Sequence, residues 1–404
     1  MKRKLLSLAA VAACAFAGSA QAQISDGIVK IGVLNDMSGL YSDITGPGSV
    51  TAARMAVEDY IKASGSKLKV EIVSADHQNK PDVGSNVARQ WYDTDKVDMI
   101  ADVPTSSVGL AIAKISADKG KLHVNSGSAT ADLSGKACNA NTIHWAYDTW
   151  MLANGTGKAI VKSGGNTWFF LTADYAFGHA LERDTEAVVT KNGGRVVGKV
   201  RTPFPTQDFS SFLLQAQASK AKIIGLANAG GDTTNSIKQA AEFGITKGGQ
   251  NLAGLLVFLP DVHSLGLNIA QGLMLTETFY WDLNDNTRAF SKRFSAAQGG
   301  KMPSMVQAGV YSSVIHYLKA VDAAKTDDGT KVAAKMKELP TDDPIFGKGS
   351  VRPDGRKIHP AYLFEVKKPA ESKGPYDYYK LVATIPANEA FRPLAESECP
   401  LVKK

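Results

Sequence analysis

The alternation of short apolar β-rich runs with amphipathic helical patterns constrains the fold of this chain most strongly. Strand-like runs at 28–34, 68–74 and 97–103 are separated by helical patterns such as SVTAARMAVEDYIKA and PDVGSNVARQWYD. A chain that passes from strand to helix to strand in this way favours a parallel sheet with helices on both faces. The first third of the sequence therefore predicts an α/β unit.

A second series of the same kind begins after HWAYDTW. Its strand-like runs at 166–171, 222–228 and 252–259 again alternate with helical patterns. Two such series predict an α/β fold of two doubly wound lobes, each built around its own parallel sheet. The two helical stretches that follow Trp281 are too few for a third domain, and the turn-rich end of the chain, from 343 to 385, predicts antiparallel additions.

These patterns set the expected domain boundaries. We expect a signal peptide at 1–22, a first lobe from 24–146 together with 281–340, and a second lobe from 147–280 together with 341–385. The remainder, 386–404, is expected to form a tail that closes the fold.

The first 22 residues have the organisation of a secretory signal peptide. A basic MKRK is followed by a short apolar stretch and by the small-residue site Ala20-Gln21-Ala22. The protein is therefore expected to be exported to the periplasm. The stretch VAAC also resembles a lipoprotein cleavage site, so a lipid anchor on Cys14 is the alternative.

Export decides how the other two cysteines are interpreted. Cys138 and Cys399 are the cysteines that follow the signal peptide, and in an oxidising compartment such a pair is expected to form a disulfide. Two unrelated thiols are the alternative.

The formal net charge of +7 is spread along the chain, without Lys/Arg runs interleaved with aromatic residues, so we expect no nucleic-acid partner.

Two hydroxyl-rich loops follow predicted strands of the first lobe. NSGSAT occupies 125–130, and VPTSS occupies 103–107. Because parallel strands end at the same edge of a sheet, and a helix begins after the second loop, their hydroxyl and N–H groups are placed to hold one small carboxylate. The alternative is that Thr105 or Ser106 only caps its helix.

Catalytic and cofactor sites fit the sequence poorly. NSGSAT lacks the G-x-S-x-G elbow of a hydrolase, and Gly46–Thr51 lacks the last glycine of a dinucleotide-binding loop. The sequence contains no HExxH or CxxC spacing for zinc. We therefore predict no catalytic residue, no metal and no cofactor, and a secreted enzyme is the less favoured class.

The second lobe offers polar residues at the corresponding strand ends. Tyr175 follows the predicted strand at 166–171, Asn228 ends the one at 222–228, and Asp261 follows the one at 252–259. Asp232 is expected to cap a helix. These positions place polar ends of both sheets around one crevice.

The sequence resembles the periplasmic branched-chain-amino-acid-binding family, the solute-binding subunits of ABC importers. The resemblance runs from about residue 26 to about residue 385, and it is carried by the order and spacing of IGVLNDMSG, SVTAARMAVEDYI, SADHQNKPD, PTSS, NSGSAT and DYAFG. It implies a bilobal Venus-flytrap fold with a three-crossing hinge, a ligand clamped between the lobes, and a membrane permease as partner. A monomer is expected.

The resemblance also implies roles for individual residues. Ser106 or Ser107 would hold the ligand carboxylate together with residues 128–130, Tyr175 would close from the other lobe, and Asp261 would take an ammonium group. The predicted ligand-binding residues are Tyr41, Ser106, Ser107, Ser128, Ala129, Thr130, Tyr175, Asn228 and Asp261.

Two ligand classes remain open. The family implies a branched-chain or related amino acid. Aromatic residues near the expected cleft favour stacking on a flat aromatic acid, such as a benzoate or a hydroxycinnamate; they are Tyr41, Trp145, Tyr147, Trp150, Tyr175, Phe177, Phe279, Tyr280 and Trp281. A ligand-sensing domain for a receptor is the rival function.

Overall fold

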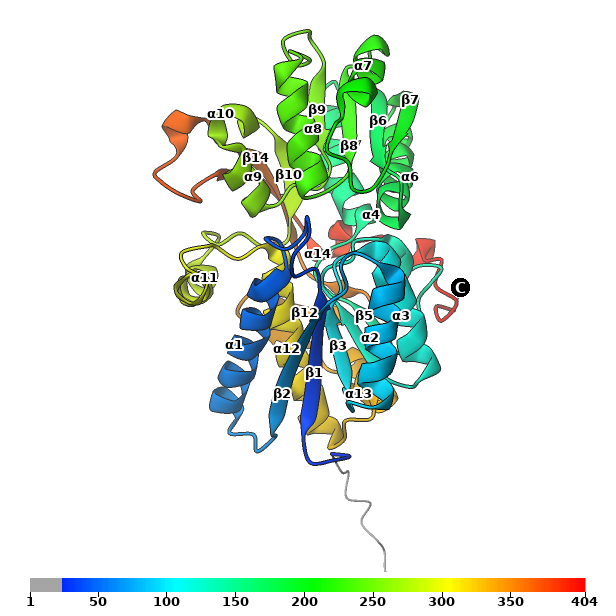
Figure 1. Cartoon of the computed structure of the whole chain (residues 1–404), viewed down its shortest axis with the longest axis vertical. Helices are drawn as coiled ribbons and strands as arrows, with labels where there is room; N and C mark the ends of the chain where they lie inside the picture. Colours follow the sequence, from blue (N-terminus) through cyan, green and yellow to red (C-terminus); the bar gives the residue numbers. More distant parts are fainter. Residues whose placement is uncertain (1–23, 404) are drawn as a thin grey trace, which may run out of the picture.

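The computed structural model describes residues 24–403, which form two α/β lobes stacked end to end (Figure 1). The predicted signal peptide and Cys14 lie outside the described residues. Within the described range, no helix is both long enough and apolar enough to span a membrane.

The first lobe contains a parallel sheet with the strand order β2-β1-β3-β4-β5. The strands β1, β3, β4 and β5 are buried, because helices cover both faces, and this explains their mostly apolar sequences. The edge strand β2 is only partly buried. The strands are β1 (Val29–Asn35), β2 (Val70–Asp76), β3 (Met99–Asp102), β4 (Leu122–Asn125) and β5 (Thr142–His144). The helices between them are α1 (Gly46–Ser64), α2 (Pro81–Asp93) and α3 (Ser106–Asp118), and η1 (Ala131–Leu133) is a single 3₁₀ turn.

The second lobe contains a parallel sheet with the order β7-β6-β8-β9. Its strands are β6 (Thr167–Ala173), β7 (Arg195–Thr202), β8 (Ile223–Ala227) and β9 (Asn251–Gly254). Its helices are α4 (Thr149–Leu152), the π-helical η2 (Ala153–Gly157), α5 (Lys158–Lys162), α6 (Ala176–Lys191), α7 (Ser210–Ala218) and α8 (Gly231–Glu242). Both predicted sheets are thus confirmed.

The predicted strand at 252–259 is wrong beyond Gly254. The next four residues, LLVF, leave the sheet, although each is almost fully buried. Pro260 then lies in the first turn of α9 (Leu259–Leu265), and the Asp261 carboxylate accepts a hydrogen bond from the Phe258 N–H. LLVF is apolar because it is buried, and its composition therefore resembles that of a strand. Pro260 and the cap by Asp261 begin a helix directly after it.

An antiparallel sheet completes the second lobe. β10 (Met274–Glu277), β14 (Ala361–Val366) and β15 (Tyr379–Ile385) lie in the order β10-β14-β15. Leu275, Phe364 and Tyr379 share a core with Leu171 and Leu226 of the parallel sheet. The short helices α10 (Leu267–Ala270) and η3 (Pro369–Glu371) lie in the connections.

Three helices after Trp281 pack on the first lobe, where two helical stretches were expected. They are α11 (Asp285–Ala297), α12 (Met305–Ala324) and α13 (Gly329–Glu338). A further antiparallel sheet, with the order β11-β12-β13, follows them and consists of β11 (Thr341–Asp343), β12 (Gly347–Val351) and β13 (Lys357–Ile358). Because Arg356 bridges to His144 at the end of β5, this sheet adjoins the first lobe. We therefore keep the predicted lobe boundaries as a proposal, with 341–358 moved from the second lobe to the first.

The chain first crosses between the lobes at 145–149, and Arg356 holds this crossing. The guanidinium is fully buried and donates to the Trp145 carbonyl at 2.7 Å and to the Tyr147 carbonyl at 2.9 Å. Asp148 lies 3.5 Å away as its ionic partner. Burial nevertheless lowers the pKa of Arg356 to about 10.

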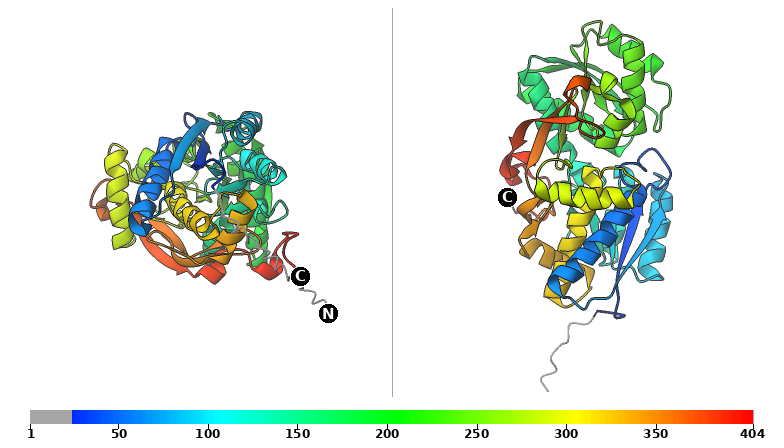
Figure 2. Two further views of the ribbon diagram at one scale, coloured as in Figure 1. Left: turned by 90° about the horizontal axis from the view of Figure 1, so that it is seen from below. Right: turned by 90° about the vertical axis from the view of Figure 1, so that its left-hand side faces the viewer.

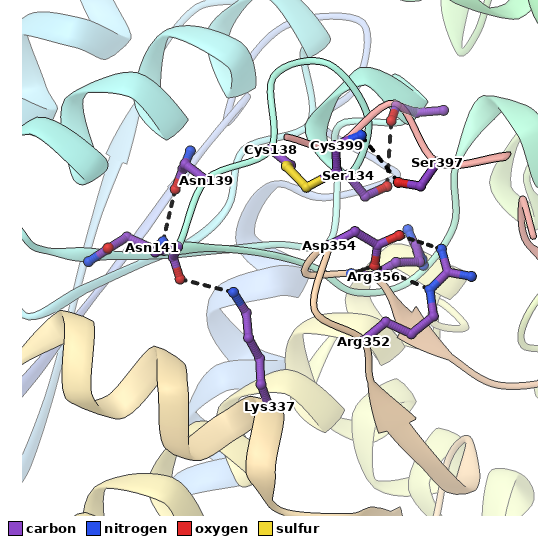
Figure 3. Close-up of a disulfide and its surroundings, with 12 residues drawn as sticks. Ser134, Cys138, Asn139, Asn141, Lys337, Arg352, Asp354, Arg356, Ser397 and Cys399 are labelled. Carbon is purple, nitrogen blue, oxygen red and sulfur yellow. Dashed lines mark hydrogen bonds and ion pairs between the residues drawn. A yellow bond between two sulfur atoms is a disulfide. The ribbon is translucent and has the colours of Figure 1, made fainter. Parts of the chain in front are cut away.

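The C-terminal tail lies beside the junction of the lobes, as Figure 2 (right) shows. It contains α14 (Ala387–Ala390) and η4 (Leu394–Glu396). The predicted disulfide between Cys138 and Cys399 is confirmed, with Cα atoms 5.5 Å apart (Figure 3).

Candidate functional site

A cavity lies between the two lobes where the parallel strands of both sheets end. The first lobe and the crossing supply Tyr41, Ile44, Thr45, Pro104, Gly127, Ala129, Tyr147 and Val306, and the second lobe supplies Tyr175, Phe177, Ala229, Leu256 and Phe258. The volume of the cavity is about 20 Å³, which is room for about one water molecule. The lobes must therefore move apart, or the lining side chains must rearrange, before a larger solute can enter.

Two tyrosines join the lobes across this cavity. The hydroxyl oxygens of Tyr41 and Tyr175 are 2.5 Å apart. Burial raises the pKa values of both phenols well above their ordinary value, so both remain neutral and able to donate a hydrogen bond. Phe204 stacks on the Tyr175 ring at 4.2 Å between centroids and on the Tyr41 ring at 6.0 Å.

Sequence analysis did not select Phe204. It follows β7, at the same edge of the sheet as the strand ends that were selected. The strand-end rule applied to β7 would have found it.

The backbone of the second lobe approaches Tyr41 closely at Gly230. A Cβ atom at this position would lie 2.7 Å from the Leu40 carbonyl oxygen and 2.9 Å from a ring carbon of Tyr41. The backbone angles are φ 57° and ψ −129°, a conformation that is essentially restricted to glycine. Gly230 thus permits the contact between the lobes.

The hydroxyls of the two predicted loops bind the loops to each other. Ser128 donates to the Val103 carbonyl at 2.5 Å, and the Thr130 N–H donates to the Ser106 hydroxyl at 3.2 Å. The Thr130 hydroxyl accepts the N–H of Asp132, as in a helix cap. The parts of these loops that line the cavity are Pro104, Gly127 and Ala129.

The polar residues of the second lobe also have structural partners. Asn228 accepts the Thr233 hydroxyl at 2.7 Å and donates to the Ser236 hydroxyl at 3.2 Å, so it secures the first turns of α8. Asp261 caps α9, and burial raises its pKa to about 7.

Of the nine predicted ligand-binding residues, Tyr41, Ala129 and Tyr175 line the cavity, whereas Ser106, Ser107, Ser128, Thr130, Asn228 and Asp261 do not. Their roles in ligand binding stay predictions.

A buried carboxyl group lies behind Gly127, which lines the cavity. A Cβ atom on Gly127 would lie 2.8 Å from Oδ1 of Asp102. Oδ2 of Asp102 accepts the Asn35 amide at 3.1 Å, whereas Oδ1 has no hydrogen-bond partner among the described residues. Burial raises the pKa of Asp102 to about 7.

We expect Asp102→Asn to remove a pH dependence of stability. The neutral carboxyl is favoured in the folded state, so its contribution is fully present below the unfolded pKa of about 4 and is lost as the pH rises through about 7. Three pKa units correspond to roughly 4 kcal/mol. Urea unfolding at pH 4.5 and pH 8 should show a gain for Asp102→Asn over the wild type that is larger at pH 8. The same stability difference between Asp102→Asn and the wild type at both pH values would contradict a raised pKa of Asp102.

The sequence and the structure agree with those of known proteins. Residues 28–374 match the family model described as periplasmic binding protein. A crystal structure of a periplasmic binding protein from Burkholderia mallei is 52% identical, with a TM-score of 0.90, over 94% of this chain and 100% of that chain. A branched chain amino acid ABC transporter periplasmic ligand-binding protein from Burkholderia xenovorans is 43% identical, with a TM-score of 0.82, over 93% and 100% of the two chains.

A more distant relative points to the same family. Leu/Ile/Val-binding protein homolog 6 of Brucella melitensis is 24% identical over 374 residues, which are 89% of this chain and 93% of that protein. Members of this family are substrate-binding proteins of ABC transporters and are not enzymes. The two-lobed α/β fold, the cavity between the lobes and these similarities show that the chain belongs to the periplasmic binding protein family.

Proposed function

We propose that this protein captures a small organic acid with a flat apolar body and delivers it to the membrane permease of an ABC importer. The observation that carries the proposal is the lining of the interlobe cavity, in which none of the thirteen residues has a charged side chain. An α-ammonium group would lose its water there without a charged partner among these lining residues. A flat ring, in contrast, finds the faces of Tyr41, Tyr147, Tyr175 and Phe258.

The carboxylate of such a ligand would use neutral donors. The Tyr41 and Tyr175 hydroxyls stay protonated, and the thirteen-residue helix α3 begins at Ser106, next to the lining residue Pro104. The N-terminus of a helix favours negative charge, because its first N–H groups and its dipole both point outward. A Rhodopseudomonas palustris solute-binding protein in complex with benzoate, 21% identical with a TM-score of 0.79, indicates that this fold accommodates an aromatic acid.

A branched-chain amino acid is the second candidate, and one observation favours it. Asp232 lies in the first turn of α8, and its Oδ1 accepts the Thr206 N–H at 3.1 Å. Its buried Oδ2 has no partner among the described residues, and the Asp232 charge adds to the effect of burial in raising the pKa values of Tyr41 and Tyr175. An ammonium group beside the tyrosine pair would find its counter-ion here, rather than at the predicted Asp261. The names of the Burkholderia xenovorans and Brucella relatives also support this candidate.

A thermal-shift screen separates the two ligand classes. A ligand at a hundred times its Kd stabilises a protein by about 2.7 kcal/mol. We expect benzoate, hydroxybenzoates or hydroxycinnamates to raise the melting temperature, and the matched neutral amides, such as benzamide, to leave it unchanged. A shift with leucine, isoleucine or valine that disappears in Asp232→Asn would favour the amino-acid candidate. A response confined to neutral sugars would contradict both.

Location, partner and assembly complete the proposal. We propose a periplasmic monomer whose closed form docks on the permease, because a closed lobe pair differs in surface from an open one. A sensor domain for a receptor is the rival. Uptake of the identified ligand by cells that lack this protein would decide against transport, and light scattering would test the monomer.

A further inference from the structure

The C-terminal tail contacts both lobes. On the first lobe, Cys399 is bonded to Cys138, and Arg352 donates to the Arg392 carbonyl at 2.8 Å. On the second lobe, Asn154 donates to the Glu389 carbonyl at 2.9 Å. The segment from 386 to 399 therefore bridges the two lobes beside the hinge (Figure 2).

The tail is also tied to α6 of the second lobe by an ion pair. The Arg392 guanidinium lies 3.4 Å from the Asp184 carboxylate, which is almost fully buried. The same carboxylate accepts the hydroxyl of Thr149, the last residue of the first crossing, at 2.6 Å. Partial burial makes this pair more significant than the exposed Lys191–Glu396 pair, whose atoms are 3.9 Å apart.

The middle of the tail packs on the hinge itself. Phe391 is buried, and its ring covers the Arg356 guanidinium at 4.2 Å from the centroid. Arg356 in turn donates to the carbonyls of Trp145 and Tyr147 in the first crossing. A change in the direction of this crossing must therefore move Arg356, and Arg356 cannot move without displacing Phe391.

Both ends of the tail are fixed. β15, which precedes it, pairs with β14 and belongs to the second lobe, whereas the disulfide fixes Cys399 to the first lobe (Figure 3). The disulfide thus adds a covalent connection between the lobes to the crossings of the chain. The 14 residues from Pro386 to Cys399 could span roughly 45 Å if fully extended, so the packed contacts limit movement more than the length does.

We propose that the segment 386–399 is a strap that restrains opening of the lobes. The disulfide keeps Phe391 and Arg392 at a high local concentration next to their partners. These contacts exist in the state in which Tyr41 and Tyr175 meet across the cavity. The strap therefore favours the closed state, and it acts without any ligand.

Hydrogen exchange in the ligand-free protein tests the strap. The amides of Trp145 and Thr149 donate to the Asn125 and Ala129 carbonyls, so their exchange reports opening of the first crossing. In a Cys138→Ser/Cys399→Ser variant, we expect these amides to exchange about tenfold faster, and small-angle scattering should give a larger radius of gyration. Arg392→Gln should change both values in the same direction by a smaller amount.

The matched control is Arg288→Gln, which removes an arginine that pairs with Asp282 and Asp285 on the surface of the first lobe. It should leave both measurements unchanged. If the double-serine variant does not fold, Arg392→Gln and folded wild type treated with a reductant carry the same expectation. Unchanged exchange and an unchanged radius in these proteins would show that the tail only packs on the surface. No ligand enters the test, so its result is independent of the proposed function.

Discussion

Gly230→Ala is expected to abolish tight ligand binding. The new methyl group would lie 2.7 Å from the Leu40 carbonyl oxygen of the opposite lobe. Because this oxygen belongs to the backbone, a side-chain rotation cannot relieve the clash. The alanine would also have to adopt a backbone conformation that costs of order 1–3 kcal/mol. The steric conflict with Leu40, unlike the backbone penalty, is released when the lobes separate. We expect at least a hundredfold loss of affinity, which corresponds to ~2.7 kcal/mol.

Titration calorimetry with the best ligand of the thermal-shift screen measures this loss, and small-angle scattering should show a more open ligand-free protein. Gly244→Ala is the matched control: Gly244 also has a positive φ, of 65°, but a Cβ atom there would meet no atom of the described residues within 4 Å. It should lower stability by only about 1–2 kcal/mol and leave the affinity unchanged. Equal affinities for the two variants would refute a closing role for Gly230.

Arg356→Leu is expected to destabilise the protein by about 3–5 kcal/mol, the usual cost of breaking a buried ion pair. The change removes the hydrogen bonds of Arg356 to the carbonyls of Trp145 and Tyr147 and leaves Asp148 as a buried charge without its partner. It also removes the cation beneath the Phe391 ring. Urea unfolding at pH 7 measures the loss.

Adding Asp148→Asn to Arg356→Leu should recover part of this stability. Asparagine removes the charge and still caps α4, where Asp148 accepts the Met151 N–H at 2.8 Å. Arg288→Leu on the surface of the first lobe should cost at most about 1 kcal/mol. If Arg356→Leu were no more destabilising than Arg288→Leu, the hinge would not depend on this arginine.

The sheets were predictable because most of their strands are buried on both faces and because the strands alternate with amphipathic helices, although the edge strands β2 and β7 are partly exposed. The same criterion failed for LLVF at 255–258, since burial alone does not distinguish a strand from a buried loop. The third helix after Trp281, α13, was missed. We move the sheet β11-β12-β13 to the first lobe because of contacts such as the bridge between His144 and Arg356, which the sequence does not reveal.

The site was predictable in position but not in detail. Strand ends pointed to Ala129 and Tyr175, and the resemblance and the set of aromatic residues pointed to Tyr41; all three line the cavity. The direction of each hydroxyl could not be deduced, because Ser128 and Ser106 find their partners in a neighbouring loop rather than in their own sequence. Phe204 and Asp232 likewise have partners far away in the sequence. Phe204 stacks on the ring of Tyr175, and Asp232 accepts a hydrogen bond from the Thr206 N–H.

The discontinuous first lobe has a consequence for the order in which the protein can assemble. Strands β1 to β5 come first in the chain, but α11, α12 and the sheet β11-β12-β13, which pack on them, come after the whole parallel sheet of the second lobe. When the chain is synthesised from its N-terminus, every strand of the second parallel sheet is present once residue 254 has been made. At that point the first lobe still lacks α12 at 305–324. During synthesis the parallel sheet of the second lobe is therefore supplied in full before the first lobe receives α12, and the second lobe in turn is completed only when β14 and β15 follow at 361–385.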